Sequence, residues 1–145
     1  MDPNLRREII LEHYQHPLNK GLVQDNTYYK ENTNNASCID NIDVMVKFEN
    51  DKIIDIRFDG EACAMSTSAT SIMIQTLLGK SLDEVKKIIL EYENMIDEKD
   101  YDEKKLEELI VYNEVYKQPN RKKCALLPFE SLKKIIKQYE ENQRI

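Results

Sequence analysis

The sequence predicts an α+β fold in which a small antiparallel sheet of about three strands packs against a set of helices. Residues 42–48 and 53–59 each alternate apolar and polar side chains with a period of two, which is typical of strands with one buried face. The segments on either side of these strands place apolar residues at helical spacing. Because the two strands adjoin each other and do not alternate with helices, their order favours α+β over α/β.

A helix is expected at the N-terminus. Asp2 can cap this helix, and Pro3 suits its first position. His13 and His16 are interpreted as structural or surface residues. The segment 16–21, HPLNKG, ends the helix, and a short third strand is expected near residues 27–31. Four apolar residues fall on roughly one face of the helix: Leu5, Ile9, Ile10 and Tyr14.

The two principal strands are expected to form a hairpin, because residues 49–52 between them are polar turn formers. A helix is expected from near Ser66 to Gly79, since glycine commonly follows the last helical residue. Ser81 and Glu84 have the spacing of a capping box and open a further helix. The residues that face inward on this helix are expected to be Leu82, Val85, Ile88, Ile89 and Tyr92.

Two more helices are expected in the C-terminal part of the chain. The charged segment 97–116 is interpreted as a helix that residues 117–120 end. The last amphipathic helix is expected to begin close to Cys124, with Pro128 in about its first turn. The whole chain, residues 1–145, is interpreted as one domain. The residues that segment 97–116 is expected to bury are Leu106, Leu109 and Ile110.

Composition limits the classes of function. The formal net charge of −6 disfavours non-specific binding to nucleic acid or to an anionic membrane. No apolar run approaches the roughly 20 residues of a membrane span, and the N-terminus has no apolar signal segment. The 3 glycines of the chain cannot build a P-loop or a dinucleotide-binding pattern. We therefore expect a cytoplasmic protein that binds neither nucleic acid nor membrane.

The three cysteines are the main candidates for chemistry. Their odd number excludes complete disulfide pairing within one chain, and scattered cysteines in a reducing compartment are buried thiols, metal ligands or reactive thiols. Cys38 precedes the first principal strand, Cys63 lies between a strand and a helix, and Cys124 lies at an expected helix start. Helix N-termini carry partial positive charge, so such positions can stabilise a thiolate if the fold brings them together.

A shared metal site is one interpretation of these cysteines. Cys38 and Asp40 point the same way if their segment is extended, and the other two cysteines would complete the four ligands of a closed zinc site. Three thiolates and one carboxylate carry more negative charge than a divalent cation can neutralise. A nearby run of basic residues is expected to offset the remaining negative charge. Spacing alone leaves open the alternative that the cysteines are small buried hydrophobes and the run a solvated surface. The basic run comprises Arg121, Lys122 and Lys123.

Four segments in order resemble the IscU/NifU N-terminal/SufU family of iron–sulfur cluster assembly proteins, and the similarity covers most of the chain. EHYQHPLNKG (12–21) resembles the family's H-Y-x-x-P-x-N-x-G pattern, and SCID (37–40) resembles its C-G-D motif. FDGEACAMSTSATSIM (58–73) and RKKCALLPFESLKK (121–134) resemble the segments around its second and third cysteines. Such an ordered set of segments is more specific than any one of them.

Two features resemble the SufU branch of this family. Lys123 stands where the IscU branch has a histidine directly before the third cysteine, and Arg121 matches the SufU-like R-x-K-C pattern. The interval between Cys63 and Cys124 is long, and the charged segment 97–113 resembles the helical insert of that branch.

The resemblance implies a zinc site formed by Cys38, Asp40, Cys63 and Cys124, with Arg121 and Lys123 as supporting charges. It also implies that Cys38 receives sulfur as a persulfide from a SufS-like cysteine desulfurase, which carries pyridoxal phosphate and acts on L-cysteine. Downstream cluster-assembly proteins would be further partners. The chain would then act as a zinc-dependent sulfurtransferase, and whether it is an enzyme in its own right stays open.

Two alternatives share the same residues. One is a scaffold on which a [2Fe–2S] cluster is assembled and handed on, and the other is an adaptor whose zinc only stabilises the fold. Two departures from the family bear on the site: Ile39 and Ala62 stand where the family has glycine, and the second change is the milder. If the family loop uses a positive φ at position 39, a β-branched residue is strained there, so we expect a more extended loop or an altered site.

Overall fold

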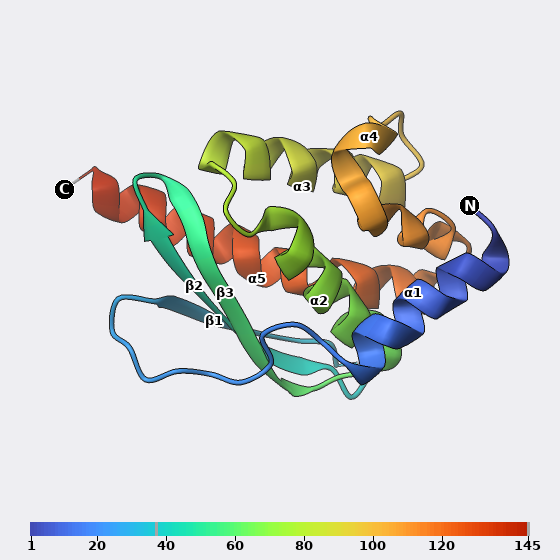
Figure 1. Ribbon diagram of the computed structural model, residues 1–145, viewed down its shortest axis with the longest axis horizontal. Helices are drawn as coiled ribbons and strands as arrows, with labels where there is room; N and C mark the ends of the chain where they lie inside the picture. The colour runs from blue at the N-terminus through green and yellow to red at the C-terminus, as the bar shows by residue number, and fades with distance from the viewer. Residues whose placement is uncertain (37, 145) are drawn as a thin grey trace.

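The computed structural model describes residues 1–36 and 38–144 and places helices on one face of a three-stranded antiparallel sheet (Figure 1). The strand order is β1–β2–β3, and β2 and β3 form the predicted hairpin. This architecture confirms the predicted α+β fold. The strands are β1 (Tyr29–Asn34), β2 (Asn41–Glu49) and β3 (Lys52–Glu61).

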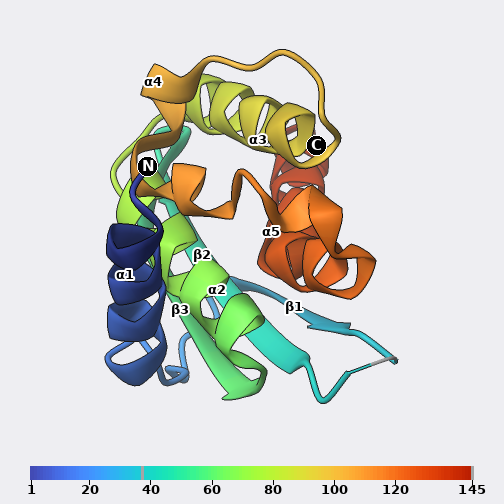
Figure 2. The ribbon, with the colours of Figure 1, turned by 90° about the vertical axis from the view of Figure 1, so that its right-hand side faces the viewer.

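The described residues form five α-helices. α2 and α5 contact the sheet and each other, and α1 packs against α2. α3 and α4 lie on the side of these helices away from the sheet (Figure 2). The layers therefore bury one face of the sheet beneath α2 and α5. The bounds are α1 (Pro3–Gln15), α2 (Ala64–Leu77), α3 (Leu82–Ile96), α4 (Glu103–Leu106) and α5 (Pro119–Gln143).

β1 lies farther along the chain than the expected strand at 27–31. Its inward positions are partly polar, because Glu31 is half-buried and Thr33 is buried. Thr33 forms a hydrogen bond with Ser131 of α5. Since polar side chains occupy the inward face, apolar alternation could not place the bounds of this strand.

The caps of α1 agree with the prediction, whereas its expected apolar face is right only in part, since Ile9 and Ile10 are partly buried against the core. Asp2 accepts a hydrogen bond from the amide N–H of Asn4, and Pro3 occupies the first helical position. Leu5 and Tyr14 are exposed, however, and the buried residue of the helix is His13. The reason is that α1 packs on a polar stretch of α2, where a ring nitrogen of His13 lies 2.7 Å from the Ser71 hydroxyl and the other lies 3.3 Å from Glu108. His13 is thus a structural residue, and His16 is exposed.

α2 begins at Ala64, slightly before the expected start at Ser66, because Cys63 caps it. The sulfur of Cys63 accepts a hydrogen bond from the amide N–H of Ser66 at 3.4 Å. The predicted end of the helix is confirmed: Leu78 is the C-cap, and Gly79 follows with φ +84°, the left-handed conformation that ends many helices.

α3 confirms its predicted start. The hydroxyl of Ser81 accepts a hydrogen bond from the amide N–H of Glu84 at 3.3 Å. Every residue that was expected to face inward is buried, namely Leu82, Val85, Ile88, Ile89 and Tyr92.

The continuous helix expected over 97–116 is wrong. The segment contains the single turn α4 and two 3₁₀ helices, Glu107–Tyr112 and Val115–Lys117. Glu107 has φ +50°, which ends α4. Leu106 and Leu109 are buried as expected and Ile110 is half-buried. Burial of Leu109, Val111 and Tyr112 covers more than one face of an α-helix, so packing favours the irregular path.

α5 begins at Pro119, which corrects the expected start near Cys124. Pro119 suits the first turn, where its missing N–H has no partner to lose. Cys124 therefore lies inside the helix, and Pro128 is an interior proline instead of a first-turn residue. Among the described residues, no helix has the length and apolar character that a membrane crossing requires.

Candidate metal centre

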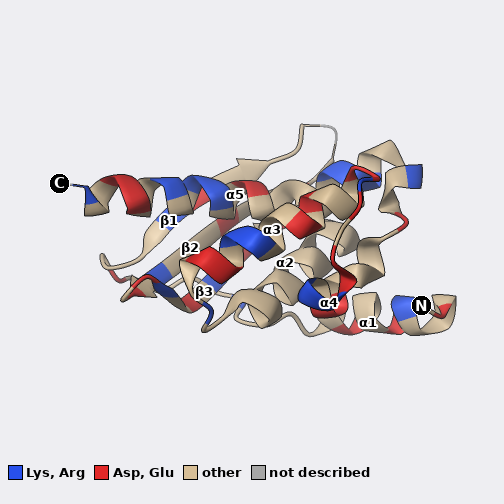
Figure 3. Ribbon diagram, turned by 90° about the horizontal axis from the view of Figure 1, so that it is seen from above, with Lys and Arg blue, Asp and Glu red and all other residues tan. Residues whose placement is uncertain are grey.

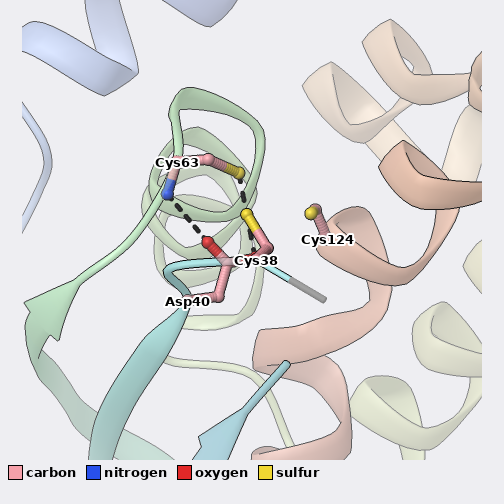
Figure 4. A group of neighbouring side chains, drawn as sticks. All are labelled: Cys38, Asp40, Cys63 and Cys124. Atoms are coloured by element: carbon pink, nitrogen blue, oxygen red, sulfur yellow. Dashed lines mark hydrogen bonds between the residues drawn. The ribbon is translucent and has the colours of Figure 1, made fainter. Parts of the chain in front are cut away.

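Four side chains from three separate parts of the chain converge at one end of the sheet (Figure 4). Two precede β2, one caps α2, and one lies within α5. Their ligand atoms all lie within 4.8 Å of one another. The residues are Cys38, Asp40, Cys63 and Cys124.

The four side chains differ in their contact with solvent. Cys38 is exposed and Cys63 is half-buried. Cys124 and Asp40 are buried, with exposed fractions of 5% and 1%. The site is therefore open at Cys38 and closed at its base.

Both oxygens of Asp40 are held by hydrogen bonds. The amide N–H of Cys63 donates to Oδ1 at 2.8 Å, and the hydroxyl of Ser66 donates to Oδ2 at 2.5 Å. Burial by itself would raise the pKa of Asp40, but these hydrogen bonds outweigh it and hold the pKa below its ordinary value. The carboxylate is thus ionised at neutral pH and oriented for a cation.

Cys63 has a double role, because the helix cap and the candidate ligand are the same sulfur. Its Sγ accepts the amide N–H of Ser66 while the N-terminus of α2 points toward it. The positive end of a helix interacts favourably with negative charge on such an atom.

Cys124 contradicts the expectation that its sulfur lies at a helix start, since it follows the first turn of α5. Burial raises the pKa of its thiol, and the neighbouring Asp40 and Cys63 raise it further. The thiol therefore keeps its proton in the absence of a cation. A metal ion would displace that proton on binding.

Of the basic run, Arg121 lines the hollow into which the three cysteines open, together with Asn120. Figure 3 shows the Lys and Arg residues of α5 in blue. The Nζ of Lys122 forms an ion pair with a carboxylate oxygen of Asp97 at 3.1 Å, and Lys122 is not among the described residues that line the hollow. Lys123 is exposed and is not among the described residues that line the hollow. Arg121 is thus the better placed of the two expected supporting charges.

The loop before β2 accommodates Ile39 without the strain that a glycine-type conformation would cause. Ile39 is not among the described non-glycine residues with positive φ, and its side chain is 67% exposed. The amide N–H of Cys38 donates to the Asn35 carbonyl and the amide N–H of Asn35 donates to the Asp40 carbonyl, each at 3.0 Å. These bonds close the loop without a left-handed residue at position 39.

Two residues that the sequence reasoning missed support the site. Gly60 has φ +135°, and a Cβ there would lie 2.1 Å from the carbonyl oxygen of Asn41, so only glycine allows β3 to approach the start of β2. Ser66 is fully buried, and its hydroxyl lies within hydrogen-bond reach of the Asp40 carboxylate and the backbone carbonyl of Cys124. The signal that could have identified Ser66 is its position three residues after Cys63, the spacing between an N-cap and its N3 residue.

The donor set fits a zinc ion. Three sulfurs and one carboxylate oxygen are ligand types that Zn²⁺ takes, in the number of a closed tetrahedral site. Ligand sulfurs around tetrahedral zinc lie about 3.8 Å apart, so the observed limit of 4.8 Å requires only a small contraction.

Comparisons with known proteins agree with one another. The family described as NifU-like N terminal domain matches residues 5–145. The zinc-dependent sulfurtransferase SufU of Bacillus subtilis (strain 168) is 32% identical over 137 residues, which cover 94% of this chain and 92% of the relative. The iron-sulfur cluster assembly scaffold protein IscU of Thermotoga maritima is 30% identical over 130 residues, which cover 90% of this chain and 91% of the relative.

Solved structures share the fold. A putative iron-sulfur cluster assembly scaffold protein for the SUF system from Fervidobacterium islandicum AW-1 has a TM-score of 0.84 at 31% identity, over 92% of this chain and 98% of that chain. The N-terminal part of a nitrogen-fixing NifU-like protein from Brucella abortus has a TM-score of 0.83 at 20% identity, over 92% of this chain and 93% of that chain. At this lower identity, the likeness shows the fold alone.

Proposed function

The chain belongs to the family of NifU-like N-terminal domains, and we propose on that premise that it binds Zn²⁺ and accepts sulfur on Cys38 during iron–sulfur cluster assembly. The sulfur donor in this proposal is a SufS-like cysteine desulfurase, and downstream assembly proteins receive the sulfur. Free thiols require a reducing compartment, so we place this activity in the cytoplasm.

The observation that carries the proposal is the gradient of exposure across the four donors. Cys38 is exposed, whereas Asp40 and Cys124 are buried. A partner enzyme could therefore reach one ligand sulfur without displacing the residues at the base of the site. This arrangement supports a separation between a residue that reacts and residues that hold the ion.

The transfer step needs no external oxidant or reductant. The thiolate of Cys38 attacks the outer sulfur of the persulfide on the desulfurase, and a new S–S bond forms on Cys38. The S–S bond on the desulfurase breaks, and the cysteine of that enzyme leaves as a thiolate. Charge and electrons balance, because one thiolate and one persulfide are consumed and one of each is produced.

The other residues prepare Cys38 for this step. Bound Zn²⁺ would keep its cysteine ligands deprotonated without redox chemistry of its own. Asp40, Cys63 and Cys124 would hold the ion. Arg121 would offset part of the negative charge at the mouth of the hollow.

The test follows sulfur from labelled L-cysteine through a purified SufS-type desulfurase to this chain. Cys38→Ala should carry no label and should leave desulfurase turnover at its unassisted rate. The matched control is Ile39→Ala, which changes the exposed neighbour and keeps every candidate ligand. Zinc content is measured for both variants. A Cys38→Ala protein that carries as much label as the wild type refutes the proposal.

A second candidate function is a scaffold for a [2Fe–2S] cluster, which the names of the IscU relatives favour. Such a cluster is held by four ligands, two on each iron, so its ligand pairs stand farther apart than the ligands of one ion. The mutual proximity of all four donors within 4.8 Å supports a single ion. Anaerobic reconstitution with iron and sulfide separates the two functions, because a stable cluster that transfers to an acceptor protein would favour the scaffold.

A further inference from the structure

One buried hydroxyl outside the four candidate ligands contacts more than one of the segments that carry them. Ser66 is 0% exposed and lies in the first turn of α2. Its hydroxyl lies 2.5 Å from Oδ2 of Asp40 and 3.2 Å from the backbone carbonyl oxygen of Cys124. The thiol of Cys63 lies 3.6 Å from the same hydroxyl oxygen. Three ligand-bearing segments therefore meet at a single side chain.

Pro128 explains why the carbonyl of Cys124 is open to a side chain. In a regular helix, this carbonyl would accept a hydrogen bond from the amide N–H of residue 128. Proline has no N–H, so the interior Pro128 removes that partner. A buried carbonyl without a partner is unfavourable, and the Ser66 hydroxyl is placed to supply one.

The two acceptors compete for one proton. A serine hydroxyl carries a single O–H donor, whereas Oδ2 of Asp40 and the Cys124 carbonyl both lie within its reach. The shorter distance to Asp40 favours donation to the carboxylate in the metal-free protein. A carboxylate oxygen has more than one lone pair, so Oδ2 can keep this hydrogen bond while it contacts a cation.

We propose that Ser66 is the positioning residue of the metal centre, tying the Asp40 carboxylate to the backbone of Cys124 through the carbonyl that Pro128 leaves open. This inference rests on the proposed metal site but not on sulfur transfer. In this proposal, Ser66 holds the two buried candidate ligands, Asp40 and Cys124, in position before the ion binds. Hydrogen-bond partners of metal ligands orient those ligands, and their loss weakens metal affinity.

Ser68 provides a matched control on the same helix. It is also 0% exposed, and its hydroxyl bonds the Tyr112 hydroxyl at 2.5 Å without contacting a candidate ligand in the described structure. Ser66→Ala and Ser68→Ala therefore remove the same group from equally buried places. Ser66→Ala should lower Zn²⁺ affinity by about 10- to 100-fold, measured by competition with a chromogenic chelator, and Ser68→Ala should leave it nearly unchanged.

A spectroscopic measurement checks the geometry independently of affinity. Co²⁺ replaces Zn²⁺ in the wild type and in both variants, and the visible absorption bands report its ligands. Ser66→Ala should shift these bands, because Oδ2 of Asp40 loses its donor, whereas Ser68→Ala should reproduce the wild-type spectrum. A Ser66→Ala protein with wild-type affinity and spectrum overturns the proposal.

Pro128→Ala separates positioning from simple stability. Alanine restores an N–H for the Cys124 carbonyl, so Ser66→Ala/Pro128→Ala should regain thermal stability that Ser66→Ala loses. It should not regain zinc affinity, since Asp40 still lacks its hydroxyl donor. Recovery of affinity together with stability would show a purely structural role and overturn the proposal. If Ser66→Ala alone does not fold, zinc affinity is measured on the double variant instead.

The outcomes distinguish this inference from the proposed function. If wild-type protein binds Zn²⁺ but accepts no sulfur, the proposed function fails while the Ser66 comparison still decides the inference. If the wild type binds only a [2Fe–2S] cluster, the same variants are compared by the rate of cluster loss. A wild type that binds neither overturns both.

Discussion

The two sides of the candidate metal centre differ in exposure and in the hydrogen bonds that hold them. Cys38, the outer candidate ligand, is exposed, and among the described contacts its amide N–H donates to the carbonyl of Asn35 in the same loop. Asp40 and Cys124, the inner candidate ligands, are buried, and both contact Ser66. The proposed function assigns ion holding and sulfur exchange to different residues of one site, and the difference in exposure supports that division, because Cys38 is the exposed residue of the four.

The largest expected effect comes from removing an inner ligand. Cys124→Ala should lower Zn²⁺ affinity by at least about 100-fold. The substitution deletes a thiolate ligand at a buried position, where a water molecule cannot readily take its place. Cys38→Ala serves as the comparison and should lose less affinity, because water can reach the position of the outer ligand. Chelator competition measures both constants. Equal losses, or a larger loss for Cys38→Ala, would remove the distinction between the two sides.

Asp40→Asn tests the inner side without a metal. Burial opposes ionisation of Asp40, yet hydrogen bonds from Ser66 and Cys63 hold its pKa below the ordinary value. The ionised carboxylate therefore stabilises the metal-free fold above its unfolded pKa of about 3.9, and this stabilisation is lost as pH falls through the lowered folded pKa. The substitution should cost about 1.5–3 kcal/mol of unfolding free energy at neutral pH, with the difference shrinking below about pH 4.

Urea unfolding of chelator-treated protein over a pH series measures this difference. Asp43→Asn is the control, because Asp43 is less buried and lies outside the four candidate ligands. If the difference in unfolding free energy between wild type and Asp40→Asn stays constant down to low pH, the assigned role of the ionised carboxylate is contradicted.

A smaller effect is expected from the charge beside the outer ligand. Arg121→Ala should slow sulfur transfer by about two- to fivefold at low ionic strength, and the difference should narrow as salt is added, because the charge is exposed. Lys123→Ala is the matched control from the same basic run. Transfer rates at low and high salt provide the measurement. Equal slowing by the two substitutions would mean that general charge, not the position of Arg121, matters.

The smallest effect is expected from the loop itself. Ile39→Gly should lower the free energy of unfolding by only about 0.5–1 kcal/mol, since glycine gives the unfolded chain more freedom. The looser loop should raise the rate at which iodoacetamide alkylates Cys38 in the metal-free protein. Ile39→Ala is the control, because it removes the exposed side chain without adding glycine-type freedom. Identical alkylation rates in the two variants would show that Ile39 does not restrain the outer ligand.

The sequence predicted regular elements where one face is uniformly apolar. α3 followed its periodicity closely, and so did β2 apart from Met45, which is buried on the side expected to be polar. In β3, Ile56 and Phe58 are buried as the alternation predicts, but the expectation that Ile54 faces inward is wrong. Ile53 is buried and Ile54 is exposed, because the pairing register with β2 shifts between Lys47 and Phe48.

Prediction was less accurate where polar side chains face inward, as in β1 with Thr33 and in α1 with His13. It was wrong over 97–116, where buried residues occupy more than one helical face. Hydrogen bonds in these regions replace the apolar signal that a pattern can detect.

The sequence by itself determined the fold class, the family and the residue types available to the site, because periodicity, turn formers and motifs are local properties of the chain. Only the tertiary structure decided that Cys124 lies inside a helix and that Ser66 meets Asp40 and the Cys124 carbonyl. It also decided that Ile39 needs no left-handed backbone. Contacts between residues far apart in the chain depend on how α2, α5 and the loop before β2 pack together, and no local pattern encodes those distances.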